Sequence, residues 1–201
     1  MEIKERIIEG ASQLFKMYGT RSVTMDSLAS HIGISKRTIY ENFQDKDEIF
    51  EGVLRHMAEK HKLLIRKILD DSDNAIEAIF RVIEMNRDHY MSMSPSFHAD
   101  MKKYHNEVLM NKSEKYEMPD YRNNIEVIER GIKQKLFRKD INPDIVNRCL
   151  YSLALSVMDD KLYPFEDFTR QEVVKNGMIN YLRGISTSEG IQLIEKRAAK
   201  I

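Results

Sequence analysis

The chain has 201 residues, which is enough for one domain or two small ones and for a hydrophobic core without disulfides. Its 32 basic and 32 acidic residues give a formal net charge of zero, which excludes a uniformly basic protein held to nucleic acid by bulk charge. No run approaches about 18 consecutive apolar residues, and the first residues lack the apolar core of a signal peptide, so we expect a cytoplasmic protein without a membrane span.

Eight glycines and four prolines leave few places to break helices, and apolar residues recur every three or four positions. This pattern predicts an all-α chain with no strand. In chain order we predict helices over residues 3–18, 25–31, 35–42, 46–71, 76–90, 97–109, 121–136, 145–158 and 169–185, with a weaker one in the tail 188–201. The single cysteine, Cys149, lies on an apolar stripe and is read as filler of the core.

The most informative segment is residues 24–46, where Thr24 and Ser35 can cap two short helices. Ala29, Gly33 and Ile39 have the spacing that a helix-turn-helix needs. The small alanine lets the helices approach, the glycine takes the turn conformation, and the apolar residue fills the space between them. An ordinary pair of short helices in a bundle is the alternative interpretation of this spacing.

Charge in this segment favours a nucleic-acid surface. Lys36 and Arg37 occupy the first turn of the third helix, where a cation opposes the helix dipole by about 0.3–1 kcal/mol. They are the two cations between Ser27 and Tyr40, a stretch without acidic residues, although residues 1–46 hold seven basic and six acidic residues. The pattern indicates an external anion, such as a DNA phosphate or a guanine edge.

The same segment closely resembles the N-terminal DNA-binding domain of TetR/AcrR-type transcriptional regulators. The residues that carry the resemblance are Thr24, Ala29, Gly33-Ile34, Ser35, Thr38-Ile39-Tyr40, Asn42-Phe43 and Lys46. Arg37 and Asn42 depart from the family pattern, which often has glycine and an aromatic residue or histidine there. The resemblance implies an N-terminal helix-turn-helix domain of three helices, residues 1–46, and a C-terminal helical ligand-binding and dimerisation domain, residues 47–201.

The resemblance also implies which residues touch DNA. Lys36 and Arg37 are expected to reach bases in the major groove, and other side chains of the segment are expected to contact phosphates. The full set is Thr24, Ser35, Lys36, Arg37, Thr38, Tyr40 and Lys46. Packing against Phe43 is the alternative role for Tyr40. Two such units, about 34–36 Å apart on a near-palindromic operator, are expected.

The family places a homodimer interface and an effector pocket in the C-terminal domain. The dimer is expected through helices 143–160 and 169–185, with a purely intramolecular core as the alternative. Candidate effector contacts are Met57, His61, Phe80, Met93, Phe97, Met101, Tyr104 and Tyr151. Each of these could instead be an ordinary core residue. No metal or cofactor is expected, since His98 and His105 are better read as exposed histidines.

These observations predict a DNA-binding transcription regulator, a homodimeric repressor that a small ligand releases from its operator. The alternative is a ligand-free DNA-binding protein of the same architecture that organises the nucleoid or activates transcription. An enzyme is not expected, because the sequence has no glycine-rich phosphate loop, no His-Glu-x-x-His motif and no recognisable nucleophile.

Overall fold

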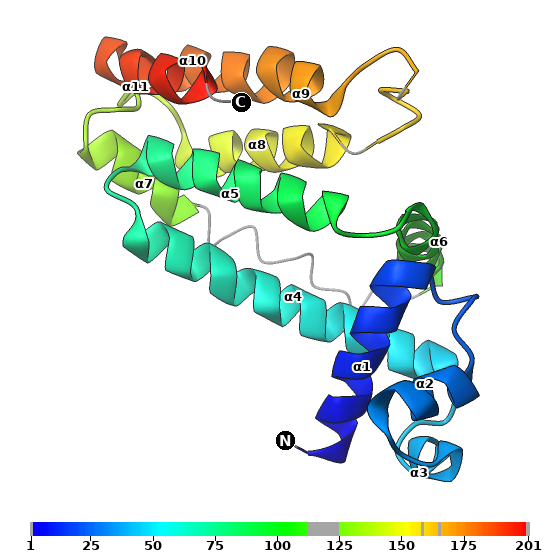
Figure 1. Ribbon diagram of the computed structural model, residues 1–201. Helices are drawn as coiled ribbons and strands as arrows, with labels where there is room; N and C mark the ends of the chain where they lie inside the picture. Colours follow the sequence, from blue (N-terminus) through cyan, green and yellow to red (C-terminus); the bar gives the residue numbers. More distant parts are fainter. Residues whose placement is uncertain (1, 112–124, 158, 165, 200–201) are drawn as a thin grey trace. The chain divides into compact units, whose positions relative to one another are not determined.

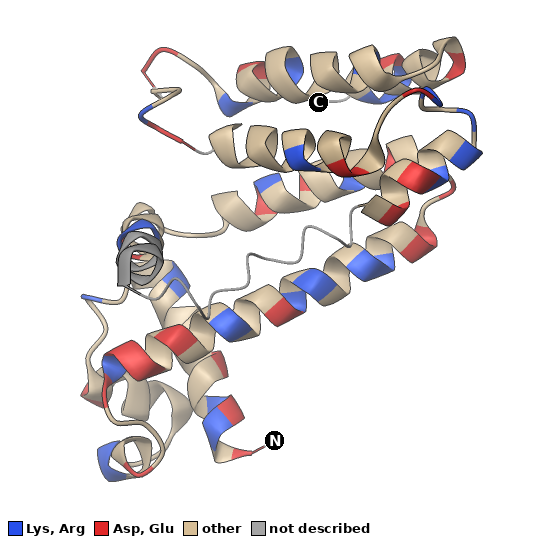
Figure 2. Ribbon diagram, turned by 180° about the vertical axis from the view of Figure 1, so that it is seen from behind, with Lys and Arg blue, Asp and Glu red and all other residues tan. Residues whose placement is uncertain are grey.

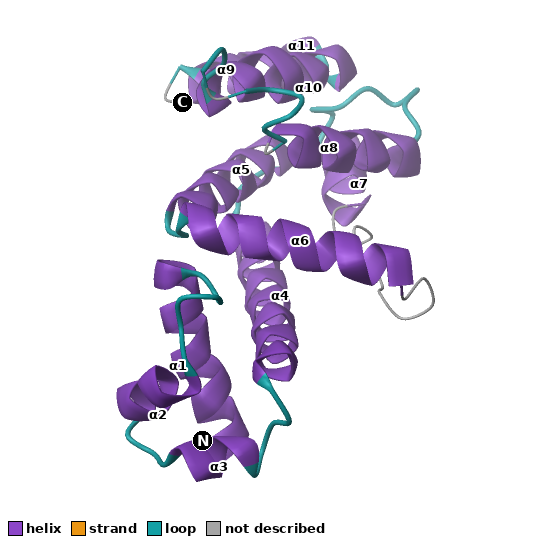
Figure 3. Cartoon of the chain, turned by 90° about the vertical axis from the view of Figure 1, so that its right-hand side faces the viewer, coloured by secondary structure: helices purple, strands orange, loops and turns teal. Residues whose placement is uncertain are grey.

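The computed structural model describes residues 2–111, 125–157, 159–164 and 166–199, with the side chains of 104–111 left out. Within these ranges the chain is helical and has no strand, which confirms the predicted all-α fold (Figure 3). The first helices are α1 (Ile3–Tyr18), α2 (Met25–Ile32), α3 (Lys36–Tyr40), α4 (Lys46–Asp71), α5 (Ala75–Met91) and α6 (Pro95–Asn111). The later ones are α7 (Ile125–Lys133), α8 (Pro143–Val157), α9 (Arg170–Val173), η2 (Val174–Ile179), α10 (Asn180–Ile185) and α11 (Ser188–Ala198).

The chain divides into two compact units. The first unit consists of residues 1–64 and 85–117, and the second unit of residues 65–84 and 118–201. The division falls inside α4 and α5, because the first turns of α4 contribute Ile49, Phe50 and Val53 to the core of the first unit. The functional boundary expected between residues 46 and 47 stays a prediction.

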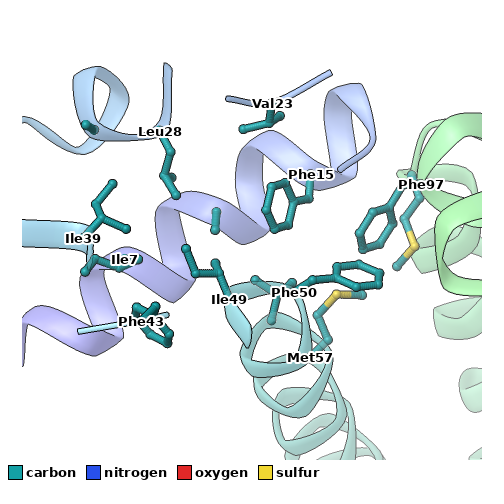
Figure 4. Close-up of a cluster of buried hydrophobic side chains, with 14 residues drawn as sticks. Ile7, Phe15, Val23, Leu28, Ile39, Phe43, Ile49, Phe50, Met57 and Phe97 are labelled. Carbon is teal, nitrogen blue, oxygen red and sulfur yellow. The ribbon is translucent and has the colours of Figure 1, made fainter. Parts of the chain in front are cut away.

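The core of the first unit joins α1, α2 and α3 to the start of α4 (Figures 1 and 4). Ile7, Ala11 and Phe15 recur every four residues on α1 and are fully buried. The Phe50 ring on α4 makes edge-on contacts with Phe15 and with Phe97 of α6, at centroid distances of 6.1 and 6.0 Å. One continuous apolar cluster therefore holds the N-terminal helices on α4 and α6.

The helix predicted over residues 46–71 is confirmed as α4. The Asp45 carboxylate accepts a hydrogen bond from the backbone N–H of Glu48 at 2.8 Å, as a helix cap does. The Glu48 side chain accepts a further hydrogen bond from the N–H of Gln44 at 2.6 Å. No helix in the described part of the chain is both long and apolar enough to cross a membrane.

The second unit buries one side of the helix predicted over residues 169–185, at Val173, Met178, Ile179, Leu182 and Ile185. That helix is present but contains a π-helical segment, η2, which the sequence pattern did not indicate. At the end of α7, Gly131 lies so close to Phe137 that a Cβ would stand 2.2 Å from the ring. Lys135 then takes a left-handed conformation, φ 59°, so the chain turns toward α8. The first residues of the helix predicted over 121–136, residues 121–124, lie outside the described residues.

Candidate nucleic-acid interface

The turn between α2 and α3 has the geometry that the sequence predicts. Gly33 adopts the left-handed conformation, φ 69°, with open space around it, so the glycine is needed for its backbone angle rather than for close packing. The N–H of Ile34 closes the turn on the carbonyl of Ala29 at 3.0 Å. Ala29 and Ile39 are buried between the helices. The helix-turn-helix is therefore fixed by its local sequence.

Both helices begin with the caps that were predicted. The Thr24 hydroxyl accepts from the N–H of Ser27 at 3.1 Å, and the Ser27 hydroxyl accepts from the N–H of Thr24 at 2.9 Å. In α3 the Ser35 hydroxyl accepts from the N–H of Thr38 at 3.0 Å. These caps satisfy N–H groups that have no partner within the helices. Thr24 and Ser35 are exposed, so their caps lie at the surface.

The end of α3 explains one departure from the family pattern. The Asn42 amide donates a hydrogen bond to the Thr38 carbonyl at 2.8 Å. A carbonyl in the last turn of a helix needs such a partner, which an aromatic side chain at position 42 could not supply. Asn42 is half-buried, and this hydrogen bond supports the end of α3.

The two expected base-reading cations are exposed but paired within the protein. Lys36 Nζ lies 2.7 Å from Asp26 Oδ2, and Arg37 Nε lies 2.9 Å from Glu41 Oε1. The hydrogen bond that Lys36 donates to the Asp26 carboxylate raises the pKa of Lys36, so this lysine is charged at neutral pH. The acid-free stretch is thus neutralised by carboxylates at its two ends, which counting charges within residues 27–40 does not reveal. Basic residues mark the exposed α3 in Figure 2.

The remaining DNA candidates surround α3. Tyr40 has half of its surface exposed, so its ring is not committed to the core beside Phe43. Lys46 is half-buried, and its Nζ donates to the Val23 carbonyl at 3.2 Å, which ties the start of α4 to the segment before α2. Thr38 is half-buried as well, with its hydroxyl 2.9 Å from that of Ser35. Contacts of these residues with DNA stay predictions.

The structure disperses the effector candidates. In the first unit, Met57 and His61 line one cavity of about 320 Å³. Met93 and Phe97 belong to the core of that unit, and Met101 packs against it. In the second unit, Phe80 is fully buried in the core and Tyr151 is half-buried on α8, while the side chain of Tyr104 lies outside the described ones.

The sequence did not point to other residues that line this cavity. Lys16 comes from α1, His56 and Lys60 from α4, and His89 from α5. His56 and Lys60 neighbour the two predicted residues on α4 and could have been found by helical spacing. Lys16 and His89 could not, because only the tertiary packing brings α1 and α5 to α4.

Two short capped helices across a glycine turn, with basic side chains exposed at the start of the second, define a helix-turn-helix DNA-binding domain. Residues 7–53 match the family described as bacterial regulatory proteins, tetR family. The chain is a TetR-type DNA-binding transcription regulator.

Relatives of known sequence agree with this assignment. YhgD of Bacillus subtilis, an HTH-type transcriptional regulator, is 31% identical over 94 residues, which are 45% of this chain and 49% of that protein. YvaF of the same organism is 26% identical over 92% of this chain and 96% of its own length. The HTH-type transcriptional repressor KstR2 of Mycobacterium tuberculosis is 26% identical, covering 92% of this chain and 93% of its own. The chain thus spans about half of YhgD and nearly all of the other two.

Solved structures share the fold. A transcriptional regulator of Saccharomonospora viridis, crystallised in complex with choline, has a TM-score of 0.63 and 20% identity, and the match covers 92% of this chain and 97% of that chain. CprB of Streptomyces coelicolor, solved with its biological operator sequence, has a TM-score of 0.62 and 17% identity over 98% of this chain and 94% of that chain. At these identities the comparisons support the architecture alone.

Proposed function

We propose that this protein is a homodimeric repressor that binds a near-palindromic DNA operator through α3 and leaves it when a small ligand binds. The observation that carries the proposal is the exposed, capped α3 with Lys36 and Arg37 in its first turn. The repressor name of KstR2 and the operator complex of CprB describe those proteins, and they make this function the best-supported one for the present chain. It would act in the cytoplasm, where the DNA is.

When α3 binds DNA, Lys36 and Arg37 have to exchange their carboxylate partners for groups of the DNA. Both carboxylate partners are exposed, with side-chain accessibilities of 71% for Asp26 and 56% for Glu41. Exposed ion pairs contribute little to stability, so a phosphate or a guanine edge can replace the carboxylates. Residues 1–46 act as the DNA-binding domain in this proposal, and residues 47–201 bind the ligand and the second subunit.

The dimer is proposed through helices 143–160 and 169–185. On α8, Ile145 and Leu155 are each 58% exposed, which is unusual for large apolar side chains unless a partner covers them. On the second helix the large apolar residues Val173, Met178 and Leu182 are buried in the chain's own core. The exposed positions there are polar, among them Asn176 and Asn180. The apolar part of the interface therefore comes from α8.

Release by a ligand follows from a population shift. A ligand that binds better to one spacing of the two DNA-binding domains lowers operator affinity by no more than its differential affinity for the two states. The choline in the Saccharomonospora viridis structure belongs to that protein, and it supports the idea that this fold accommodates small ligands.

The test of DNA binding uses duplexes from the DNA that flanks this gene, searched for inverted repeats and titrated by fluorescence anisotropy. Lys36→Ala with Arg37→Ala should abolish specific binding while the helical circular dichroism spectrum stays unchanged. The matched control, Lys62→Ala with Lys67→Ala, removes two exposed charges from α4 and should leave specific binding intact. Equal binding by the α3 double variant and the wild type would show that α3 does not read the operator.

The dimer is tested separately by analytical ultracentrifugation. Leu155→Glu places a charge on the proposed interface and should shift the protein toward monomer. Leu63→Glu changes a residue that is 69% exposed on α4 and should leave the assembly state unchanged. A Leu155→Glu variant that remains dimeric at the wild-type concentration would move the interface away from α8.

A further inference from the structure

One cavity of the first unit carries a concentration of basic side chains that DNA binding does not explain. It has a volume of about 320 Å³ and is lined by α1, α4 and α5. Lys16 and Lys60 face it, together with His56, His61 and His89. Of the lining residues Glu9 is the one carboxylate, and its Oε1 lies 3.4 Å from Lys60 Nζ. The lining thus has five groups that hold or can hold positive charge and one negative group.

These groups repel one another. Burial lowers the pKa of Lys16, and the charge of Lys60 lowers it further. Burial also lowers the pKa of His89, assisted by Lys16, His61 and His98. The positive charges of this cluster destabilise one another. An anion bound among them would be stabilised, because it would offset their repulsion.

His56 shows the same feature, with a polar atom left over. Burial lowers its pKa, and Lys60 and Lys16 add to the effect while Glu9 and Glu5 oppose it. The His56 Nε2 atom is buried, and no hydrogen-bond partner for it exists among the described residues. A buried ring nitrogen without a partner is costly, and an oxygen atom of a ligand in this cavity would supply the partner.

The lining also contains apolar side chains. Met57, Leu64 and Met85 contribute thioether and aliphatic side chains, which adapt to irregular ligands. A volume of about 320 Å³ lies at the small end of ligand pockets in proteins. The cavity lining therefore combines basic side chains with flexible apolar ones.

We propose that this cavity binds a small amphipathic anion, with its carboxylate or phosphate group held by Lys16, Lys60 and the three histidines and a short apolar part against Met57 and Met85. The inference rests on the proposed ligand-released regulator, because it assigns that effector a chemical class and a place.

The cavity also has a direct connection to the DNA-binding helices. Gln13 of α1 lines it, and the Gln13 side-chain oxygen lies 3.0 Å from Nε2 of His31 in the last turn of α2. An anion that joins α1 to α4 would fix the helix on which α2 packs. Ligand binding and the position of the helix-turn-helix are thus coupled within one compact unit.

The direct test follows the imidazole resonances of the histidines by NMR, in the full chain without DNA. Hexanoate and hexyl phosphate are the two probes, and hexan-1-ol and hexylammonium are the neutral and cationic controls. We expect both anions to shift the resonances of His56 and His89 and to raise the pKa of both, since an anion favours the imidazolium. Affinity for hexanoate, which is ionised at both pH values, should accordingly be higher at pH 6 than at pH 8. Equal shifts with hexan-1-ol, or no shift with either anion, would overturn the proposal.

Two variants locate the site. Lys16→Gln removes a lining cation. It should weaken binding of the tighter-binding anion about tenfold, which is the scale of one charged hydrogen bond. Lys62→Gln removes an exposed lysine of the same long helix that does not line the cavity, and should bind like the wild type. If Lys16→Gln does not fold, as circular dichroism will show, His89→Gln replaces it with the same expectation. Equal losses in Lys62→Gln and the lining variant would refute the location.

Operator titrations with and without the anion separate this inference from the proposed function. Binding of an anion that leaves operator affinity unchanged supports the anion site and contradicts ligand release by it. Release of the operator by a neutral compound, with no anion binding, supports the proposed function and overturns the anion site. Equal affinity for hexanoate and hexyl phosphate would support a site that recognises the negative charge common to both. Tighter binding of one probe would identify a carboxylate or a phosphate as the group that the site recognises.

Discussion

Gly10, in the middle of α1, gives a sharp test of how the helix-turn-helix is held. A Cβ added at this position would lie 2.1 Å from Cγ2 of Ile32 at the end of α2. Real Cβ contacts lie beyond about 3.4 Å, so Gly10→Ala forces α2 to move by more than an ångström or Ile32 to leave its rotamer. Gly10 is thus the residue that permits the close approach of α1 and α2.

The magnitude follows from two opposing terms. Alanine is better than glycine inside a helix by about 1 kcal/mol, which favours the variant. Forcing extra atoms into a packed contact costs about 1–3 kcal/mol. The net result should be destabilisation by about 0–2 kcal/mol. Displacement of α2 should also weaken operator binding by more than the stability loss alone explains, because α2 positions α3.

The assay is urea unfolding at one fixed protein concentration, followed by circular dichroism. Gly52→Ala is the matched control, since it also lies inside a helix of the first unit. The atom nearest to its added Cβ is the flexible tip of Ile8, at 2.7 Å, which can rotate away. Gly52→Ala should therefore be neutral or stabilising by up to about 1 kcal/mol.

A double-mutant cycle isolates the contact. Ile32→Ala removes the Cγ2 atom, so Gly10→Ala should cost much less in that background, with a coupling of about 1 kcal/mol or more. If Gly10→Ala stabilises the protein as much as Gly52→Ala does, the argument from the close approach of α1 and α2 is refuted.

Three further predictions concern the same unit. Asp26→Asn frees Lys36 and should raise operator affinity by up to about fivefold in anisotropy titrations, whereas unchanged affinity would show that the pair does not compete with DNA. Lys46→Ala should weaken all duplexes alike and flatten the salt dependence of binding by about one unit of slope. Asp100→Ala removes the carboxylate that accepts from the Thr20 N–H and hydroxyl at 2.7 and 2.8 Å, and should cost about 1–3 kcal/mol in urea unfolding; a loss below about 0.5 kcal/mol would contradict it.

The features that sequence predicted well are those that local chemistry decides. Thr24 and Ser35 cap α2 and α3 because a hydroxyl at that position satisfies N–H groups two or three residues ahead. Gly33 ends its helix because it adopts a positive φ of 69°. Such interactions span only a few residues, so they can be predicted from the local sequence.

The features that sequence missed depend on contacts between distant segments. The same helical period describes a side chain that faces the chain's own core and one that faces a second subunit. The sequence therefore left both roles open for the helix over residues 169–185, where the structure buries Val173 and Met178 within the chain. The pairing of Lys36 with Asp26 joins α3 to α2 across the turn. The basic cavity needs Lys16 of α1 beside His56 of α4, which no spacing along the chain reveals.

The ion pairs of Lys36 and Arg37 also affect how strongly this chain, whose net charge is zero, distinguishes an operator from other DNA. Nonspecific DNA offers phosphates alone, and these must compete for Lys36 and Arg37 with carboxylates that are already 2.7 and 2.9 Å away. An operator also offers base edges to these two side chains. Contacts with the base edges can offset the free energy lost when the ion pairs break, which other sequences cannot do. The two carboxylates therefore act against nonspecific binding more than against specific binding, and removing either one should narrow the ratio between the two affinities.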